Sequence, residues 1–192
     1  MSMSQTFSSV AVPDSSDFSL RPVSDQDRDR LLTWRNSTRV RRHMFTTAVI
    51  RADEHRRWFS RVMRESRDRH LVLQVDGSPI GFVSFSPVST EDGATHWGIY
   101  IGEPDAPPGS GTALGQLALD YAFGSLGATT VVSEVMSDNQ PAIRLYERLG
   151  FRSCGERRML RDHGGAEETV IEFRISAPEW KSRDASGPIH DG

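Results

Sequence analysis

The stretch from Trp97 to Phe151 restricts the possible folds of this chain more than any other. It contains, in order, a β-rich segment, a glycine- and proline-rich loop, a helical pattern, a β-branched segment and a second helical pattern. The first helical pattern is the clearest, because its apolar residues repeat at i, i+3, i+4, i+7 and i+8 and form one stripe. They are Leu114, Leu117, Ala118, Tyr121 and Ala122. Such alternation of strands and helices predicts an α/β or α+β sheet domain.

The flanking sequence continues this alternation. Strands are expected at residues 18–23, 70–75, 79–87, 96–101, 129–136, 151–160 and 168–175, and helices at about 24–34, 52–66, 114–122 and 139–149. The turn Asp76-Gly77-Ser78 predicts a hairpin, and Gly150 is expected to end the last helix. A chain of 192 residues suffices for one domain of this kind, which we place at residues 18–176.

The two ends of the chain differ from this domain in composition. Residues 1–17 contain six serines, which predicts a flexible leader, and residues 177–192 are polar with Gly and Pro, which predicts a flexible tail. No apolar run approaches the roughly 18 residues of a membrane span, and the first residues lack the basic and apolar segments of a signal peptide. We expect no membrane partner and a cytoplasmic location.

Cysteine and histidine usage excludes several kinds of site. Cys154 is the only cysteine, so neither an intrachain disulfide nor a CxxC zinc site can form, and we expect it to be a small buried residue. The six histidines show no metal-ligand spacing and no HExxH motif, so no metal is expected. The G-x-S-x-G elbow of serine hydrolases is also absent.

Positive charge is concentrated in the first third of the chain. Between Arg21 and Arg69 there are fourteen Arg against seven Asp or Glu, although the whole chain has a net charge of −3. Such a segment is typical of a nucleic-acid face, a phosphate pocket or a solvated helix with ion pairs. The interleaved acidic residues favour the solvated helix.

The loop Pro107-Pro108-Gly109-Ser110-Gly111-Thr112-Ala113 joins a predicted strand to the clearest helix. Glycines allow close approach of the backbone to a ligand, and a helix N-terminus offers unpaired N–H groups to an anion such as pyrophosphate. A plain strand-to-helix connection is equally compatible with this pattern. The dinucleotide fingerprint and the P-loop are both excluded, because the third glycine and the GK[ST] sequence are missing.

Asn139 and Tyr146 are the second candidate pair. Seven residues are close to two helical turns, so both side chains leave the same helix face, about 10 Å apart along the axis. An extended ligand could meet the amide of Asn139 and, at its reactive end, the phenol of Tyr146. The alternative is a half-buried tyrosine that packs beside Leu145 and Leu149.

The order of these segments resembles the core of the GCN5-related N-acetyltransferases (GNAT). WGIYIG, PPGSGTA, LGQLALDYAF, VVSEVM and SDNQPAIRLYERLGF follow one another as they do in that family, and the last is the most specific. The resemblance implies an α+β fold with a mostly antiparallel, partly parallel sheet of about seven strands flanked by about four helices. It also implies acetyl-CoA as the co-substrate.

The same resemblance implies roles for particular residues. Gly109, Ser110, Gly111, Thr112 and Ala113 would line the pyrophosphate of acetyl-CoA. Backbone groups of Ile99 and Ile101, together with Asn139, would flank the pantetheine arm, and Tyr146 would protonate the leaving thiolate.

A closer resemblance, to the PseH branch of the family, covers nearly the whole domain. It is found in LLTWRN, VRRHMF, DEHRRWF, PIGFVSF and WGIYIG. It implies acetylation of the 4-amino group of a UDP-linked dideoxy aminosugar in pseudaminic acid biosynthesis. The matching residues of the acceptor half are Trp34, Arg35, Asn36, His55 and Trp58, and by charge alone Arg35, Arg39, Arg41 and Arg42 are candidates for the acceptor's diphosphate. Trp34 or Trp58 could stack on the acceptor or could belong to the core.

The expected reaction is direct attack of a neutral amine on the thioester. Glu134, through a water molecule, and His96 are the candidate bases, although Glu134 could equally be a strand carboxylate paired with an arginine. Two other kinds of protein stay open: a protein N-terminal or antibiotic-modifying N-acetyltransferase, and a non-catalytic CoA- or RNA-binding protein. The presence of both Asn139 and Tyr146 argues against the last. A nucleic-acid partner is therefore not expected, and an edge strand near the C-terminus makes a homodimer plausible.

Overall fold

The computed structural model describes residues 18–66, 69–161 and 167–184, so the predicted leader and the last part of the predicted tail lie outside the described residues. A seven-stranded sheet forms the centre of the molecule, in the order β1-β2-β3-β4-β5-β7-β6. Its strands are β1 (Phe18–Pro22), β2 (His70–Val75), β3 (Ser78–Phe85), β4 (Ala94–Ile101), β5 (Thr130–Met136), β6 (Arg152–Leu160) and β7 (Glu167–Ser176). All neighbours are antiparallel except β4 and β5, which confirms the expected mixed sheet.

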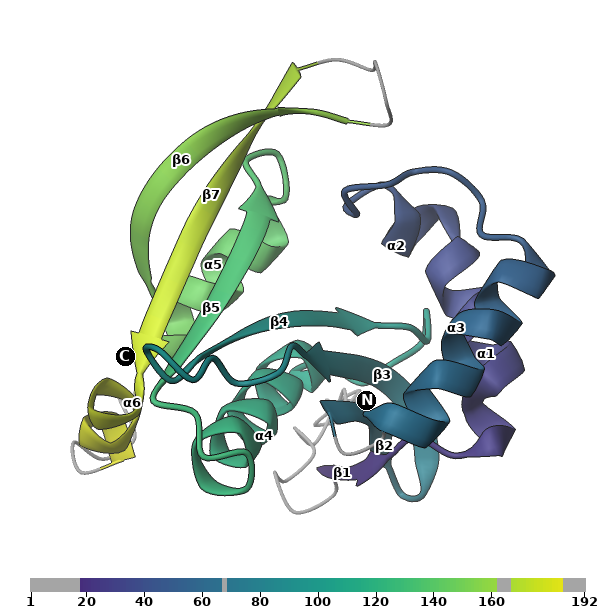
Figure 1. The fold of residues 1–192 in the computed structure, drawn as a ribbon, viewed down its shortest axis with the longest axis horizontal. Helices are drawn as coiled ribbons and strands as arrows, with labels where there is room; N and C mark the ends of the chain where they lie inside the picture. Colours follow the sequence, from purple (N-terminus) through teal and green to yellow (C-terminus); the bar gives the residue numbers. More distant parts are fainter. Residues whose placement is uncertain (1–17, 67–68, 162–166, 185–192) are drawn as a thin grey trace, which may run out of the picture.

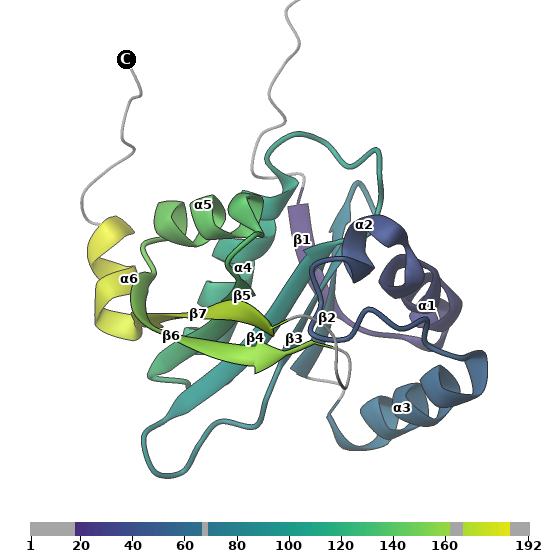
Figure 2. The same ribbon diagram turned by 90° about the horizontal axis from the view of Figure 1, so that it is seen from above.

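Helices cover both faces of this sheet (Figures 1 and 2). In the described residues they are α1 (Arg28–Asn36), α2 (Thr38–Arg41), α3 (Ala52–Glu65), α4 (Ser110–Gly124), α5 (Gln140–Leu149) and α6 (Ala177–Asp184), with a 3-10 turn at Asp25–Asp27. The two helices beyond the expected four are the short α2 and α6. Helices α1 to α3 gather on one side of the sheet, and α4 and α5 lie on the other.

Helix α6 corrects the expectation of a flexible tail from residue 177. Trp180 is buried in the main core, and its indole N–H donates to Oδ1 of Asp120 on α4 at 2.7 Å. Glu179 also accepts from the backbone N–H of Ser176 and so caps the start of the helix. The domain therefore continues at least to Asp184.

The sheet separates two hydrophobic clusters. The larger lies between the sheet and α4, α5 and α6, and includes Leu73, Leu119 and Tyr146. The smaller joins α1 and α3 to the opposite face of β2 and β3 through Trp34, Phe59 and other residues. Cys154 belongs to neither cluster: it is exposed on the edge strand β6, so the expectation of a buried cysteine is wrong.

The central feature of the sheet is the junction of β4 and β5. These parallel strands pair only where Ala94–His96 meets Thr130–Val132. Beyond this point β4 continues beside β3 and β5 continues beside β7, so the two strands diverge (Figure 1). The divergence leaves backbone groups of Trp97–Ile101 without a partner strand on the β5 side.

Candidate active site

A cavity of about 1150 Å³ lies at this divergence. Its walls come from α1, α2 and the segment after it, α3, β3, β4, β5, the first turn of α4 and one side of α5. Of the predicted site residues, those that line it are Arg35, His55, Trp58, Ile99, Ile101, Gly109, Gly111, Thr112, Glu134, Asn139 and Tyr146. The fold thus brings residues from position 35 to position 146 to one cavity.

The glycine loop contributes the start of α4. Gly109 is the N-cap residue and has a φ of 88°, a conformation that favours glycine. A side chain at Gly109 would meet nothing within 4 Å, and one at Gly111 would meet only Leu145, at 3.8 Å, so both backbones are open to an approaching group. In the described residues the Gly111 and Thr112 N–H groups have no backbone acceptor, as expected for a first helical turn. This arrangement fits the pyrophosphate of acetyl-CoA.

Two residues of the predicted loop site do not line the cavity. Ser110 is buried, and its hydroxyl donates to the carbonyl of Pro107 at 2.6 Å, which closes the turn before α4. Ala113 packs against the main core, and its N–H donates to the Gly109 carbonyl. Both residues therefore stabilise the loop from its core side and do not face the cavity.

Asn139 is the N-cap of α5. Its Oδ1 accepts from the Ala142 N–H at 3.3 Å, which satisfies one of the free donors of the first turn. Asn139 also lines the cavity, so its side chain both caps the helix and faces the space where the sequence places an extended ligand.

Tyr146 reaches the same cavity from within the core. It is 4% exposed and is surrounded by the rings of Trp97, Phe151 and Phe173. Burial raises the pKa of its phenol, while the hydrogen bond from Ser133 acts in the opposite direction. A phenol that keeps its proton at neutral pH and lines a cavity is suited to be a general acid.

Ser133 is a residue that sequence reasoning missed. It lies on β5, is 2% exposed, and its Oγ donates to the phenolic oxygen of Tyr146 at 2.9 Å. Because Tyr146 accepts this bond, its own O–H is free to donate to another group. The pattern of β5 alone gives no sign of this contact, since small polar residues are common in strands.

The candidate bases occupy different environments. Both oxygens of Glu134 accept from Arg157, at 3.0 and 3.1 Å, so Glu134 is the ion-paired strand carboxylate that the sequence left as an alternative. His96 lies on β4, is exposed and lines the cavity. Among the described residues, only the backbone N–H of His96 forms a side-chain hydrogen bond, to Ser86, and its imidazole has none. Glu134, in contrast, is already paired with Arg157.

The predicted acceptor residues divide into two groups. Arg35, His55 and Trp58 line the cavity, whereas Trp34, Asn36 and Arg41 do not. Trp34 packs against Gly102, and its indole N–H donates to Oε1 of Glu103 at 3.0 Å.

Asn36 and Arg41 hold the surrounding scaffold instead. The amide of Asn36 exchanges two hydrogen bonds of 2.9 Å with the backbone of Ile50, which fixes the segment that leads into α3. Arg41 is half-buried in the last turn of α2. Asn36 therefore acts on the cavity only through the backbone that it positions.

The acceptor side of the cavity contains two buried donors without a partner in the described residues. They are Nη1 of Arg35 and Nδ1 of His43. Burial lowers the pKa of both groups, and for His43 the neighbouring Arg42 acts in the same direction. Buried polar groups are nearly always hydrogen-bonded, so these two are places where a ligand would supply the acceptor.

The two sides of the cavity also meet away from the β4–β5 junction. Arg161, at the end of β6, donates to the carbonyls of Met44 and Arg42 and forms an ion pair of 2.9 Å with Glu168 on β7. The segment after α2 is thus held against the β6–β7 hairpin, 117 residues away in sequence. Together with the junction, this contact bounds the cavity on two sides.

In residues 18–66, 69–161 and 167–184, no helix is long and apolar enough to cross a membrane. No group of three His, Cys, Asp or Glu side chains in the same residues could hold a metal ion.

A splayed mixed sheet with a glycine-rich helix start beside the splay is the arrangement expected from the resemblance to the GNAT family. The family model described as the acetyltransferase (GNAT) domain matches residues 17–152, so the chain belongs to this family. The protein is accordingly an N-acetyltransferase that uses acetyl-CoA.

Individual relatives have different names. The chain is 26% identical over 129 residues to acetyltransferase PseH of Campylobacter jejuni, covering 67% of this chain and 79% of that protein. It is 25% identical over 145 residues to spermidine N(1)-acetyltransferase of Escherichia coli, covering 76% and 78%. A solved spermidine N-acetyltransferase of Vibrio cholerae, in complex with CoA and spermine, has the same fold with a TM-score of 0.79, 21% identity, and coverage of 86% and 99%. Similarity alone therefore does not choose between the sugar acceptor expected from the sequence motifs and a polyamine acceptor.

Proposed function

We propose that the acceptor is the 4-amino group of a UDP-linked dideoxy aminosugar. The observation that supports this choice is the charge of the cavity wall. Six arginines line the cavity, namely Arg35, Arg39, Arg42, Arg57, Arg61 and Arg148, against the two carboxylates Glu54 and Glu134. Glu134 is already paired with Arg157, which leaves Glu54 as the only other acidic side chain among the lining residues.

This wall suits an anion and opposes a polyamine. A UDP-linked sugar has two negative charges on its diphosphate, and guanidinium groups bind phosphate oxygens with charge-assisted hydrogen bonds. A polyamine has several positive charges, and each would be repelled by the lining arginines. The half-buried Arg35 strengthens the argument, because its Nη1 lacks an acceptor and no carboxylate in the described residues pairs with it.

In this proposal, the residues of the cofactor half keep the roles that the sequence implies. The Gly111 and Thr112 N–H groups bind the pyrophosphate, and the unpaired backbone of Ile99 and Ile101 orients the pantetheine arm. Bound acetyl-CoA supplies an activated acyl group with a thiolate as leaving group. Tyr146 gives its proton to the departing sulfur, while Ser133 holds the phenolic oxygen.

The proton of the amine requires a separate acceptor. Of the two candidates, we assign this role to His96, because the oxygens of Glu134 are held by Arg157. His96 projects from β4 into the cavity and takes the proton from the amine, either directly or through a water molecule. Glu134 then balances the charge of Arg157.

An acceptor panel tests the proposal. The purified protein is incubated with acetyl-CoA and, in parallel, a UDP-4-amino-4,6-dideoxy sugar, spermidine, an aminoglycoside and an N-terminal peptide, and products are detected by mass. Gain of one acetyl group on the UDP-sugar alone is expected. Preferential acetylation of spermidine would refute the charge argument, and acetylation of the peptide or aminoglycoside would refute the acceptor class while leaving the family intact. The Arg35→Gln variant should raise KM for the sugar nucleotide more than KM for acetyl-CoA.

A further inference from the structure

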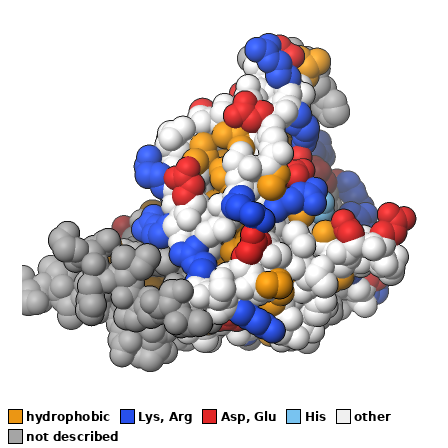
Figure 3. Space-filling model, turned by 90° about the vertical axis from the view of Figure 1, so that its left-hand side faces the viewer, with side chains coloured by type: hydrophobic (Ala, Val, Ile, Leu, Met, Phe, Trp, Pro, Cys, Tyr) orange, Lys and Arg blue, Asp and Glu red, His pale blue; other side chains and the backbone are white. Residues whose placement is uncertain are grey.

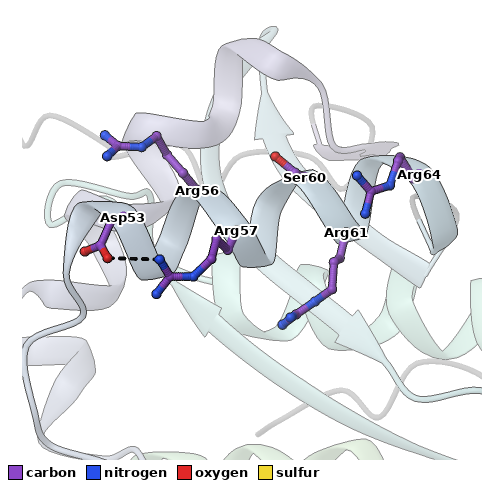
Figure 4. Close-up of a pocket in the computed structure, with 6 residues that line it drawn as sticks. All are labelled: Asp53, Arg56, Arg57, Ser60, Arg61 and Arg64. Atoms are coloured by element: carbon purple, nitrogen blue, oxygen red, sulfur yellow. Dashed lines mark hydrogen bonds and ion pairs between the residues drawn. The ribbon is translucent and has the colours of Figure 1, made fainter.

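A second concentration of arginine lies outside the cavity, on the outer face of α3. Arg56, Arg57, Arg61 and Arg64 line a shallow hollow of about 510 Å³ together with Asp53 and Ser60 (Figure 4). We call this surface the α3 arginine face. No residue of it was among the predicted site residues.

Helix geometry explains how this face meets the cavity. His55, Phe59 and Val62 are buried on one side of α3, and the arginines project from the opposite side. Glu54, Trp58 and Arg61, spaced by four and three residues, follow one line of the helix between these two sides and line the cavity. Arg57 and Arg61 line both the cavity and the outer hollow, so the two spaces share a rim.

The charges of the α3 arginine face are incompletely balanced. Asp53 is its only carboxylate, and it already pairs with Arg57 at 3.0 Å and with Arg51 at 3.1 Å. Arg64 reaches only Glu65, at 3.6 Å, and Arg61 has no ion pair among the described residues. Arg57 and Arg61 are moreover like charges at i and i+4, an arrangement that destabilises a helix.

One other arginine-bearing surface is better balanced. On the side formed by β6, β7 and α6, positive and negative side chains are interspersed (Figure 3). There Arg158 pairs with Glu167 at 2.7 Å and Arg174 pairs with Glu172 at 2.7 Å. Neighbouring guanidinium groups with too few carboxylates to balance them are suited to a multivalent anion, which would relieve their mutual repulsion.

We propose that Arg57, Arg61 and Arg64 form an anion subsite that binds the diphosphate of the acceptor where it leaves the cavity, with Trp58 beside it as a flat surface for the attached base. Trp58 is half-buried at the cavity wall, next to Arg57 in the chain and one turn from Arg61. The amine would then lie deep in the cavity and the phosphates at its rim. This inference rests on the proposed function for the identity of the ligand, but not for the existence of an anion site.

Two measurements on the double variant Arg61→Gln/Arg64→Gln test the subsite. The first is binding of UDP by titration calorimetry, with uridine as the uncharged comparison. The second is steady-state turnover of the UDP-amino sugar. Arg158→Gln, which removes one charge from β6, is the matched control.

The double variant is expected to bind UDP about tenfold more weakly and to raise KM for the sugar nucleotide by a similar factor, with KM for acetyl-CoA and kcat within twofold of wild type. The difference should shrink in 0.5 M NaCl, because salt screens exposed charges. Arg158→Gln should behave like wild type. Circular dichroism of the variants verifies that α3 remains folded.

The outcomes separate this inference from the proposed function. Wild-type turnover of the UDP-amino sugar with unchanged KM and UDP affinity in the double variant would overturn the subsite and leave the proposed acceptor standing. Absence of turnover, together with UDP binding that the double variant loses, would overturn the acceptor and support the subsite. Binding of a single-stranded RNA but not UDP, lost in the double variant, would overturn it in favour of a nucleic-acid surface.

Discussion

The hydrogen bond between Ser133 and Tyr146 gives a quantitative prediction about the active site. Both groups are almost fully buried, and the Ser133 hydroxyl donates to the phenolic oxygen at 2.9 Å. Tyr146→Phe leaves the Ser133 hydroxyl buried without its partner, which costs about 1–3 kcal/mol. Ser133→Ala leaves a phenol that still lines the cavity, where its hydroxyl can bond to water, so we expect a smaller cost of about 1 kcal/mol.

The double variant should be more stable than the sum of these losses predicts. Removing both partners leaves no orphaned group, so its total loss should be about 1 kcal/mol, equivalent to a coupling energy of about 1–3 kcal/mol. In a domain of this size, each kcal/mol corresponds to about 2–4 °C in Tm. Thermal and urea unfolding of the four proteins measure the coupling. Losses that add to within about 0.5 kcal/mol would refute the hydrogen bond.

Activity gives an independent readout of the same pair. Tyr146→Phe should lower kcat by about 10²-fold or more, because the general acid is lost, and should leave acetyl-CoA affinity nearly intact. Ser133→Ala should lower kcat by a smaller factor, about tenfold, without changing KM, since the acid is present but no longer held. Wild-type kcat in Ser133→Ala would exclude a positioning role for this serine.

Three further predictions concern stability. A Cβ at Gly115 would lie 2.4 Å from Cδ1 of Leu149, so Gly115→Ala should cost about 1–2 kcal/mol in urea unfolding, whereas Gly124→Ala, on the same helix with no atom within 4 Å, should be neutral or stabilising. Burial holds the pKa of His55 below its ordinary value of 6.5, so the unfolded chain binds more protons than the folded one. The free energy of unfolding should therefore decrease as the pH falls below about 6.5. Unfolding monitored by fluorescence at a series of pH values should show a smaller decrease for His55→Gln than for wild type. Asp27 accepts from Nη1 and Nη2 of Arg21 and from the Ser24 N–H, and these hydrogen bonds lower its pKa against the opposing effect of burial. Asp27→Asn should therefore cost about 2–3 kcal/mol of folding stability at pH 7. This difference from wild type should be lost as the pH falls below about 3.8 and the wild-type carboxylate becomes protonated.

The sequence predicted those parts of the molecule that depend on local patterns. The strands, the helix stripe from Leu114 to Ala122 and the helix end at Gly150 are set by side-chain periodicity and by backbone preferences within a few residues. The assignment of the glycine loop, Asn139 and Tyr146 to one ligand came instead from the order of the motifs, which resembles the GNAT family; the local patterns alone left it open.

Features that depend on distant contacts could not be predicted in this way. Trp34 and Arg35 are neighbours on α1 but have different surroundings, because Trp34 packs against Gly102 whereas Arg35 lines the cavity. The periodicity of the sequence does not predict this difference. Helix α6 forms where Trp180 finds Asp120, sixty residues earlier. The contact of Arg161 with Met44 likewise has no local signature.

The brief pairing of β4 with β5 has a consequence for how the folded protein resists cleavage by proteases. Only three residue pairs join the two halves of the sheet there, so local opening at this point breaks few backbone hydrogen bonds. A ligand that contacts both strands adds its binding free energy to the closed form, about 2.7 kcal/mol at a concentration one hundred times its Kd. Acetyl-CoA is therefore expected to slow both amide hydrogen exchange along Trp97–Ile101 and proteolysis between the halves, which would couple the lifetime of the enzyme to its supply of co-substrate.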